Sequence, residues 1–239
     1  MVGTVRKDGF RQLGPALPEY KIDWGLRSYL QRVYGLMGCG LGVTGAVAAL
    51  ASTSGLFLAL VGTPLFWVIL FAPLVLVFLL SFRIERMSIG AAHLAFWSYA
   101  ALVGLSLGGL FLIYTGVSLA TTFFAAAAMF LGLSLYGYMG RSLEGLGPAL
   151  FAGLIAIVLA SVVNVFLGSS GLDIAISAVG IVVFSGLAAW DTQRIKAIYD
   201  VGIDCDLEAK SAILGALTLY LDFLNLFLML LRFMGRRHD

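Results

Sequence analysis

Two aspartates in the last two apolar segments are the residues that could do chemistry. Asp191 lies in the run A-A-W-D-T-Q-R-I-K, and Asp222 lies in A-L-T-L-Y-L-D-F-L-N-L-F-L-M-L-L-R-F-M-G, from Ala216 to Gly235. The second run is long and apolar enough to cross a bilayer, which takes about 20 residues. A carboxylate at the centre of such a span costs roughly 2.5 to 3.5 kcal/mol and usually faces a bundle interior or a water-filled path. Each aspartate therefore needs a partner.

The two aspartates could be partners of each other. Asp191 lies about 6 residues, or about 9 Å, from the inner end of its segment, and Asp222 lies about 11 residues, or about 16 Å, past Ser211. Consecutive segments joined by a short loop are expected to be antiparallel neighbours, so the carboxyl groups could meet. Two carboxylates that meet in a low-dielectric bundle cannot both be ionised comfortably and would share one proton. Such a pair titrates as a unit, which predicts a pH sensor.

The same side chains, when ionised, are hard oxygen ligands suited to Ca²⁺. Asn225, one turn after Asp222, and Asn164 in the fifth apolar segment are further oxygen donors. Because Ca²⁺ prefers about six to eight oxygens, a site made by Asp191, Asp222 and Asn225 would be weak and partly filled by water, as ion passage requires. The alternative is that the aspartates only join two helices through hydrogen bonds, each worth about 0.6 kcal/mol on average.

A second group of acids, Asp200, Asp204, Asp206 and Glu208, follows the sixth apolar segment. It lacks the glycine and the final glutamate of a calcium-binding loop. We expect a solvated loop there.

Composition predicts the elements that must position the aspartates. Of the 239 residues, 61% are hydrophobic and 12% are charged, and the mean hydropathy is +1.00, whereas a soluble domain is about a quarter charged. The apolar runs recur along the whole chain and do not alternate, which predicts an all-α membrane protein with seven transmembrane helices. We expect these spans at residues 33–53, 62–82, 90–112, 117–138, 147–167, 173–197 and 211–234.

The first 32 residues differ from the rest of the chain. Residues 1–21 are basic and contain glycine and proline, which is typical of a loose tail. From Ile22 to Tyr34 apolar residues recur at helical spacing among basic residues, which indicates either an interfacial helix or a lead-in to the first span. We therefore divide the chain into residues 1–32, a cytoplasmic tail with an interfacial helix, and residues 33–239, a seven-helix transmembrane domain. Small residues at Gly35, Gly38, Gly42 and Gly45 in the first span, and at Gly104 and Gly108 in the third, favour close helix packing.

Lysine and arginine alternate between successive connections. The counts are six before the first span, then none, two, none, one, none and three. Basic loops stay in the cytoplasm, so the N-terminus is expected there. Arg232, Arg236 and Arg237 conflict with this rule, since seven spans place the C-terminus outside. Re-entry of the Asp222 segment would remove the conflict, but we expect seven crossing spans.

Several functional classes are excluded by the residues. Cys39 and Cys205 give no metal framework, and the net charge of +2 is divided among loops rather than gathered in a patch for nucleic acid. The G-x-G-D pattern of intramembrane aspartyl proteases is absent, and the last span has no lysine that could bind retinal. We expect a protein that is not an enzyme and has no cofactor.

The sequence from Leu219 to Gly235, preceded by W-D-T-Q-R-I-K, resembles the last two helices of the Bax inhibitor family, also called the transmembrane Bax-inhibitor-motif family. The stretch G-L-R-S-Y-L-Q-R-V-Y resembles its bacterial members. The resemblance implies a seven-helix bundle in the bacterial inner membrane with the last helix central. It also implies a pH-sensitive calcium leak through the lipid bilayer, gated by aspartates that match Asp191 and Asp222.

The resemblance further implies a latch, in which an arginine matching Arg83 binds one of the two carboxylates. Glu85 could pair with Arg83 or Arg86 instead, and both arginines could be ordinary charges of an inner loop. Some relatives suggest a different role for the whole protein. The alternative is a non-conducting membrane regulator that binds other membrane proteins, such as a membrane-bound protease.

Overall fold

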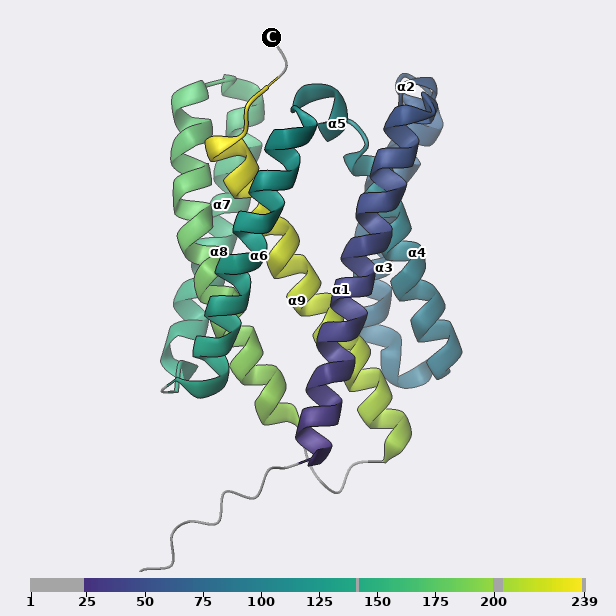
Figure 1. Cartoon of the computed structure of the whole chain (residues 1–239), viewed down its shortest axis with the longest axis vertical. Coiled ribbons are helices and arrows are strands. Elements are labelled where there is room, and N and C mark those ends of the chain that lie inside the picture. The colour runs from purple at the N-terminus through teal and green to yellow at the C-terminus, as the bar shows by residue number, and fades with distance from the viewer. Residues whose placement is uncertain (1–23, 141, 200–203, 238–239) are drawn as a thin grey trace, which may run out of the picture.

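The described part of the chain contains seven long helices (Figure 1). The computed structural model describes residues 24–140, 142–199 and 204–237. Each of the seven predicted spans corresponds to one helix, so the predicted fold class is confirmed. The helices are α1 (Trp24–Thr53), α3 (Pro64–Arg83, extended by the 3₁₀ turn Ile84–Arg86), α4 (Ile89–Leu107), α6 (Gly116–Met139), α7 (Gly147–Leu167, preceded by the 3₁₀ turn Glu144–Leu146), α8 (Ser170–Ile198) and α9 (Cys205–Met234).

Two of the helices begin earlier than the apolar pattern predicts. The first helix is continuous from Trp24, so the expected boundary between residues 32 and 33 lies inside α1, as in a lead-in to the span. The last helix begins at Cys205, and the prediction that Asp206 and Glu208 lie in a loop is wrong. Both acids lie in the first turn of α9, where the helix dipole favours negative charge. The tail of residues 1–21 and Asp200 lie outside the described residues.

Short connections and local caps determine where the other spans begin. Ser88 and Thr115 accept hydrogen bonds from backbone N–H groups three residues later, which caps α4 and α6. Ser169 does the same for α8 directly after Gly168, whose φ of 60° ends α7. The short helix α2 (Leu56–Leu60) lies in a connection that was expected to be a loop, and the short helix α5 (Leu110–Ile113) forms the end of the third predicted span.

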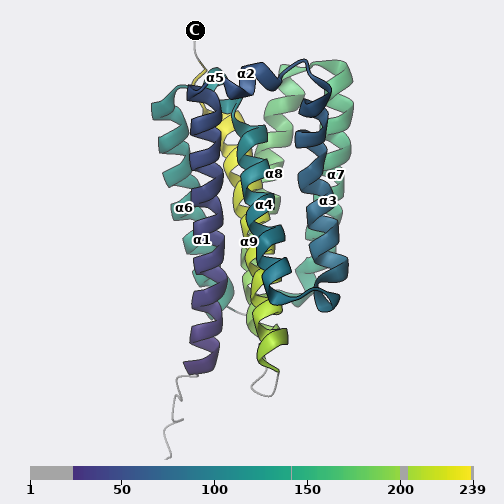
Figure 2. The ribbon, with the colours of Figure 1, turned by 90° about the vertical axis from the view of Figure 1, so that its right-hand side faces the viewer.

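The last helix lies at the centre of the bundle (Figures 1 and 2). It packs against α1 and α4 on one side and against α6 and α8 on the other, while α3 packs on α4 and α7 packs on α8. Two thirds of the span in α9 is buried (67%), against 6% in α7. The expectation that the last helix is central is therefore confirmed.

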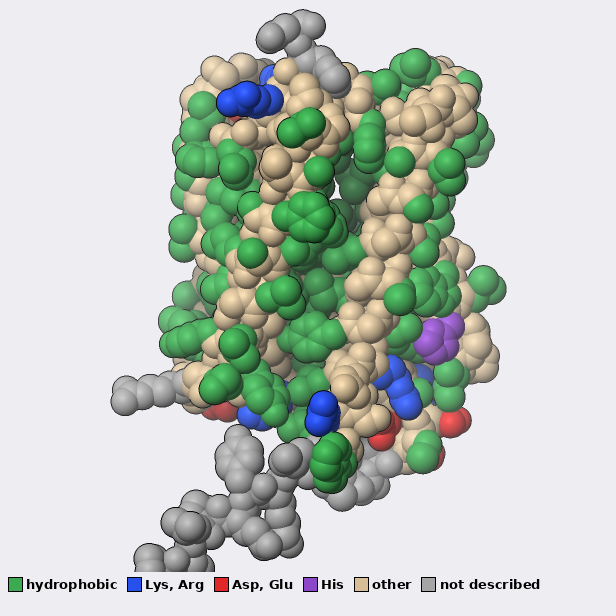
Figure 3. All heavy atoms as spheres, viewed as in Figure 1, with side chains coloured by type: hydrophobic (Ala, Val, Ile, Leu, Met, Phe, Trp, Pro, Cys, Tyr) green, Lys and Arg blue, Asp and Glu red, His purple; other side chains and the backbone are tan. Residues whose placement is uncertain are grey.

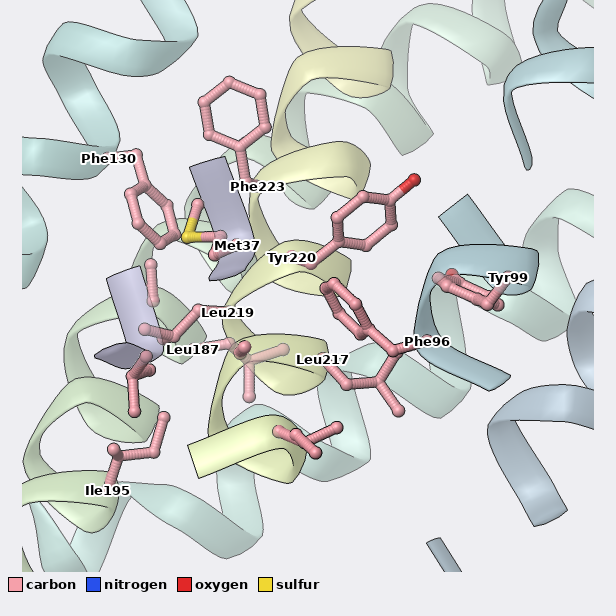
Figure 4. Close-up of a cluster of buried hydrophobic side chains, with 14 of the residues drawn as sticks. Met37, Phe96, Tyr99, Phe130, Leu187, Ile195, Leu217, Leu219, Tyr220 and Phe223 are labelled. Carbon is pink, nitrogen blue, oxygen red and sulfur yellow. The ribbon is translucent and has the colours of Figure 1, made fainter. Parts of the chain in front are cut away.

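Large side chains from the surrounding helices converge on α9 (Figure 4). The aromatic ring of Tyr220 packs edge-on against those of Phe96 and Tyr99 from α4. The hydroxyl oxygen of Tyr220 lies 2.7 Å from Thr44 Oγ1 of α1. The Thr44 hydroxyl donates to the carbonyl oxygen of Ala100 in α4 at 2.9 Å. One polar group thus joins three helices inside an apolar core.

Of the glycines predicted to pack helices together, those of the first span do not do so. Gly35, Gly38, Gly42 and Gly45 are exposed, and a Cβ atom added at any of them would meet no atom within 4 Å. The prediction is confirmed in α4, where a Cβ atom added at Gly104 would lie 2.5 Å from the carbonyl oxygen of Thr44 and one added at Gly108 would lie 3.0 Å from the Phe57 ring. The spacing of small residues in the sequence does not say which face of a helix meets a neighbour.

The two ends of α9 lie at opposite ends of the bundle (Figure 1). This segment therefore does not turn back. The beginning of α1 and the beginning of α9 lie at the same end, which we call the lower end. After α9 the backbone of Arg236 and Arg237 pairs with Tyr114 and Thr115 at the upper end. On the face shown in Figure 3, charged side chains gather at the two ends of the bundle. Hydrophobic side chains lie on the surface between these ends.

Candidate functional site

The structure brings Asp191 and Asp222 together. Asp191 lies in the last third of α8 and Asp222 lies in the middle of α9, and their carboxyl groups are within hydrogen-bonding reach of each other. Both residues are only 6% exposed. Oxygen Oδ2 of Asp222 is buried and has no hydrogen-bond partner among the described residues. A buried, unsatisfied oxygen is costly, so this position favours a shared proton or a bound cation.

Hydroxyl groups link the turn of α8 that contains Asp191 to α1 and α6. Thr192, next to Asp191, donates to Ser134 of α6 at 3.3 Å, and its Oγ1 lies 3.2 Å from Tyr34 Oη of α1. Gly137 of α6 lets this helix approach the backbone of α8 at Ala189. The polar contacts and the close backbone approach both hold the Asp191 turn of α8 against its neighbours.

A cavity of about 240 Å³ reaches the pair from the lower end. Asp191 lines this cavity and Asp222 does not, so Asp191 is the first carboxylate that a cation entering from this end would meet. The other polar residues on its wall come from α1, α3, α8 and α9 and are Tyr29, Ser81, Arg194, Ser211 and Thr218.

Polar residues continue along α9 beyond this cavity. Ser211, Thr218, Asp222, Asn225 and Arg232 recur at intervals of three, four or seven residues, which places them along one face of the helix. The first two line the lower cavity. Arg232 lines a second cavity at the upper end. The face therefore connects the two ends of the bundle through the aspartate pair.

The arginine expected to act as a latch is not paired with an aspartate. Arg83, in the last turn of α3, is exposed, and no ion pair links it to Asp191 or Asp222 in the described parts of the chain. Its near neighbour Ser81 lines the lower cavity. Glu85 forms no ion pair with Arg83 in the described residues either. The backbone carbonyl oxygen of Glu85 accepts a hydrogen bond from Lys210 Nζ at 3.0 Å.

A cation that shares the wall of the lower cavity with Asp191 is Arg194, one turn later on α8. Its guanidinium group lies 5.4 Å from the centre of the Trp190 ring, and it lines the lower cavity with Asp191. Sequence reasoning counted Arg194 only as a charge of an inner loop. The spacing of three residues between Asp191 and Arg194, which puts the two side chains on one helix face, was the signal that could have identified it.

The proposed oxygen ligands do not all lie at the pair. Asn225 follows Asp222 by one turn and uses its amide nitrogen to bond the Leu221 carbonyl oxygen at 2.9 Å, which leaves its oxygen as an acceptor. Asn164 lies in the upper cavity, and its oxygen accepts from the Ser169 N–H at 3.1 Å. The suggestion that Asn164 assists the aspartates is therefore wrong. Within the described ranges, no three His, Cys, Asp or Glu residues form a metal cluster.

Comparison with known proteins agrees with the resemblance of the last two helices and extends it to nearly the whole chain. Residues 26–239 match the family model described as "Inhibitor of apoptosis-promoting Bax1". The chain is 46% identical over 221 residues to the inner membrane protein YbhL of Escherichia coli. The matched region covers 89% of this chain and 93% of YbhL. The chain is 45% identical over 219 residues to the uncharacterized protein RP147 of Rickettsia prowazekii, covering 91% and 93%.

Proposed function

Because the chain belongs to the Bax inhibitor family of membrane proteins, we propose that it is a pH-sensitive calcium leak whose gate is the pair Asp191 and Asp222. The observation that carries this proposal is the meeting of two buried carboxyl groups behind a cavity that reaches the lower end of the bundle. When the pair shares one proton, it carries a single negative charge and one of its carboxyl groups is a poor ligand for a cation. When both groups are ionised, they become hard oxygen ligands for Ca²⁺.

The polar face of α9 supplies a path for the ion. It leads from Ser211 and Thr218 in the lower cavity, past Asp222 and Asn225, toward the upper end. Oxygen donors spaced along a helix allow an ion to exchange ligands stepwise with water, which a conducting site needs because tight binding would stop passage. We place Asp191, Asp222 and Asn225 as transient calcium ligands on this path.

The location follows from the same proposal. We place the protein in the inner membrane with its lower end in the cytoplasm. The alternation of basic residues in the connections supports this orientation. The name of the E. coli relative, an inner membrane protein, supports the location.

The test is calcium flux into vesicles that contain the purified protein, measured against pH for the native chain and for Asp222→Asn. We expect pH-dependent flux from the native chain and flux that no longer depends on pH from the variant. The amide has nearly the same shape but cannot exchange a proton, so the pair no longer changes its charge state as a unit.

Asp206→Asn is the matched control, since it removes an exposed carboxylate from the first turn of the same helix. It should retain the pH dependence of the native chain. If Asp222→Asn follows the native pH curve, the pair is not the sensor.

A second candidate function rests on a groove between α1 and α6. Two cavities of about 300 and 320 Å³ share Leu41, Phe123 and Phe223 and expose α9 to the membrane side (Figure 3 looks onto this face). Gly38 and Gly42 lie on the α1 rim of this groove, where small residues would let a transmembrane helix of another protein approach closely. This arrangement supports a non-conducting regulator that binds other membrane proteins. Calcium flux no greater than that of empty vesicles would favour it over the leak.

A further inference from the structure

The upper end of the bundle contains a second cavity, of about 560 Å³, which the proposed gate does not use. The last two turns of α9, from Leu228, form one wall of this cavity. The end of α4 and the short helix α5 lie on one side of it, and α7 and α8 lie on the other. Its polar residues are Ser161, Asn164, Asp173, Arg232 and Arg237.

Positive charge exceeds negative charge on the wall of this cavity. Arg232 lies 3.9 Å from a carboxylate oxygen of Asp173, at the outer limit of an ion pair, and both side chains are partly exposed, at 42% and 34%. Such a pair is weak, since water screens it. Arg237 has no carboxylate partner among the described residues. Its guanidinium group lies 6.0 Å from the ring centre of Tyr114. Among the described residues that line the cavity, two guanidinium groups therefore face one carboxylate.

The backbone holds Arg237 at this position. Arg237 pairs with Tyr114 in an isolated antiparallel bridge, and the carbonyl oxygen of Arg236 accepts from the Thr115 N–H at 3.2 Å. The N–H of Arg236 in turn donates to Ser118 Oγ at 2.8 Å. These bonds fix the chain after α9 across the beginning of α6, so the backbone holds Arg237 at the rim of the cavity.

Neutral donors complete the polar part of the wall. The Asn164 oxygen is occupied by the Ser169 N–H, so its amide nitrogen remains as a donor. The wall thus offers guanidinium and amide N–H groups, which are the donors that bind phosphate oxygens, and arginine binds them in bidentate fashion.

The rest of the wall is apolar. Leu107, Leu110 and Ile113 come from the ends of helices, and Val165 lies two residues before the end of α7. Val165 and the adjacent Phe166 are 81% and 85% exposed on the outside of the bundle. A cavity that combines cationic donors with apolar residues at the end of a transmembrane bundle has the polarity of a phospholipid.

We propose that this cavity binds the phosphate of an anionic glycerophospholipid in the leaflet at the upper end, through Arg232 and Arg237. The lipid competes with Asp173 for Arg232. A zwitterionic lipid binds less well, because its own cation lies close to the two guanidinium groups. The site is independent of whether the aspartate pair conducts ions.

The test is binding of phosphatidylglycerol to the purified full-length protein in detergent, counted by native mass spectrometry, with phosphatidylcholine as the comparison lipid. We expect phosphatidylglycerol to bind more tightly, and we expect Arg237→Gln to weaken it about tenfold, the effect of losing one charge-assisted hydrogen-bonding group. Arg237→Gln keeps the backbone bridge and the Asp173 pair, so the fold is retained.

Two further variants separate binding from general effects of charge. Arg236→Gln removes the same charge from the neighbouring residue, whose side chain does not line the cavity, and should leave binding unchanged. Asp173→Asn should strengthen binding, because it frees Arg232. A merely structural role for the ion pair predicts the opposite, a loss of melting temperature without tighter lipid binding.

Three results would overturn the proposal. The first is equal binding of the two lipids, and the second is equal weakening by Arg236→Gln and Arg237→Gln. The third is full displacement of phosphatidylglycerol by millimolar inorganic phosphate, which would make the cavity a site for free phosphate rather than for lipid.

Discussion

At the scale of residues, the important feature is that two buried carboxyl groups meet and that one of them, Asp222, keeps a buried oxygen without a hydrogen-bond partner among the described residues. Asp222 has a buried oxygen without a hydrogen bond in the described structure, and Asp191 faces a cavity that also contains Arg194. A purely structural pair of aspartates would be expected to satisfy its oxygens with backbone or hydroxyl donors. The incomplete satisfaction is what distinguishes this pair from the hydroxyl contacts of Thr192 and Ser134 next to it.

Arg83 allows a prediction at this scale. If its side chain moves to a carboxylate in the closed form, Arg83→Ala should raise the basal calcium leak, because the closed form loses a charged partner. Since Arg83 is exposed and unpaired with the aspartates here, we expect a severalfold effect, comparable with loss of about 1 kcal/mol from an exposed ion pair.

The measurement is flux into vesicles at one fixed pH, with Arg86→Ala as the control. Arg86 is an equally exposed arginine in the turn after α3, so its removal changes the same surface charge. Equal leaks from both variants would show that Arg83 acts only as an inner-loop charge.

At the scale of elements, α9 is positioned by close backbone contacts between the helices around it. Gly104 brings α4 against α1 at Thr44, and Thr44 in turn reaches Tyr220 of α9. On the other side, Gly180 of α8 accommodates Met229 of α9. Both contacts depend on the absence of a side chain, so the position of Asp222 depends on glycines that lie far from it in the sequence.

Gly104→Val therefore has a predictable effect. The added side chain would meet the Thr44 backbone and Val47 of α1, and overpacking of this kind costs about 1 to 3 kcal/mol. We expect a lower melting temperature in detergent than for the native chain. Gly42→Val makes the same chemical change on a helix face with no atom within 4 Å and should change the melting temperature little. Equal destabilisation of both variants would mean that helix propensity, rather than packing, is responsible.

At the scale of the whole molecule, α9 separates two groups of three helices. The group of α1, α3 and α4 and the group of α6, α7 and α8 each pack internally, and both pack on α9. The groove between α1 and α6 and the upper cavity between α4 and α7 lie along the two seams. Tyr34 and Thr192 link the groups near the aspartate pair. A shift of one group against the other would therefore act directly on the surroundings of Asp191.

Labelling of single cysteines can check the path of α9 across the membrane. Two single-cysteine variants are needed. Cys39→Ser leaves native Cys205, which lies exposed at the start of α9. Cys39→Ser with Cys205→Ser and Arg236→Cys leaves one cysteine just after the end of α9. We expect an impermeant maleimide to label only the cysteine at position 236 in intact cells and to label Cys205 after the membrane is opened. Labelling of both positions from outside would contradict a crossing α9, and the reverse pattern would contradict the proposed orientation.

The sequence by itself determined that there are seven transmembrane spans, where their apolar parts lie, and that Asp191 and Asp222 need partners. These features depend on the lengths of apolar runs and on the cost of a carboxylate in lipid, which are local properties of the chain. Only the tertiary structure decided which residues surround the pair. Gly104 rather than Gly42 packs helices, and Arg194 rather than Arg83 stands beside Asp191. In a membrane, polarity does not say which apolar face of a helix meets another helix and which meets lipid, because both environments are equally apolar.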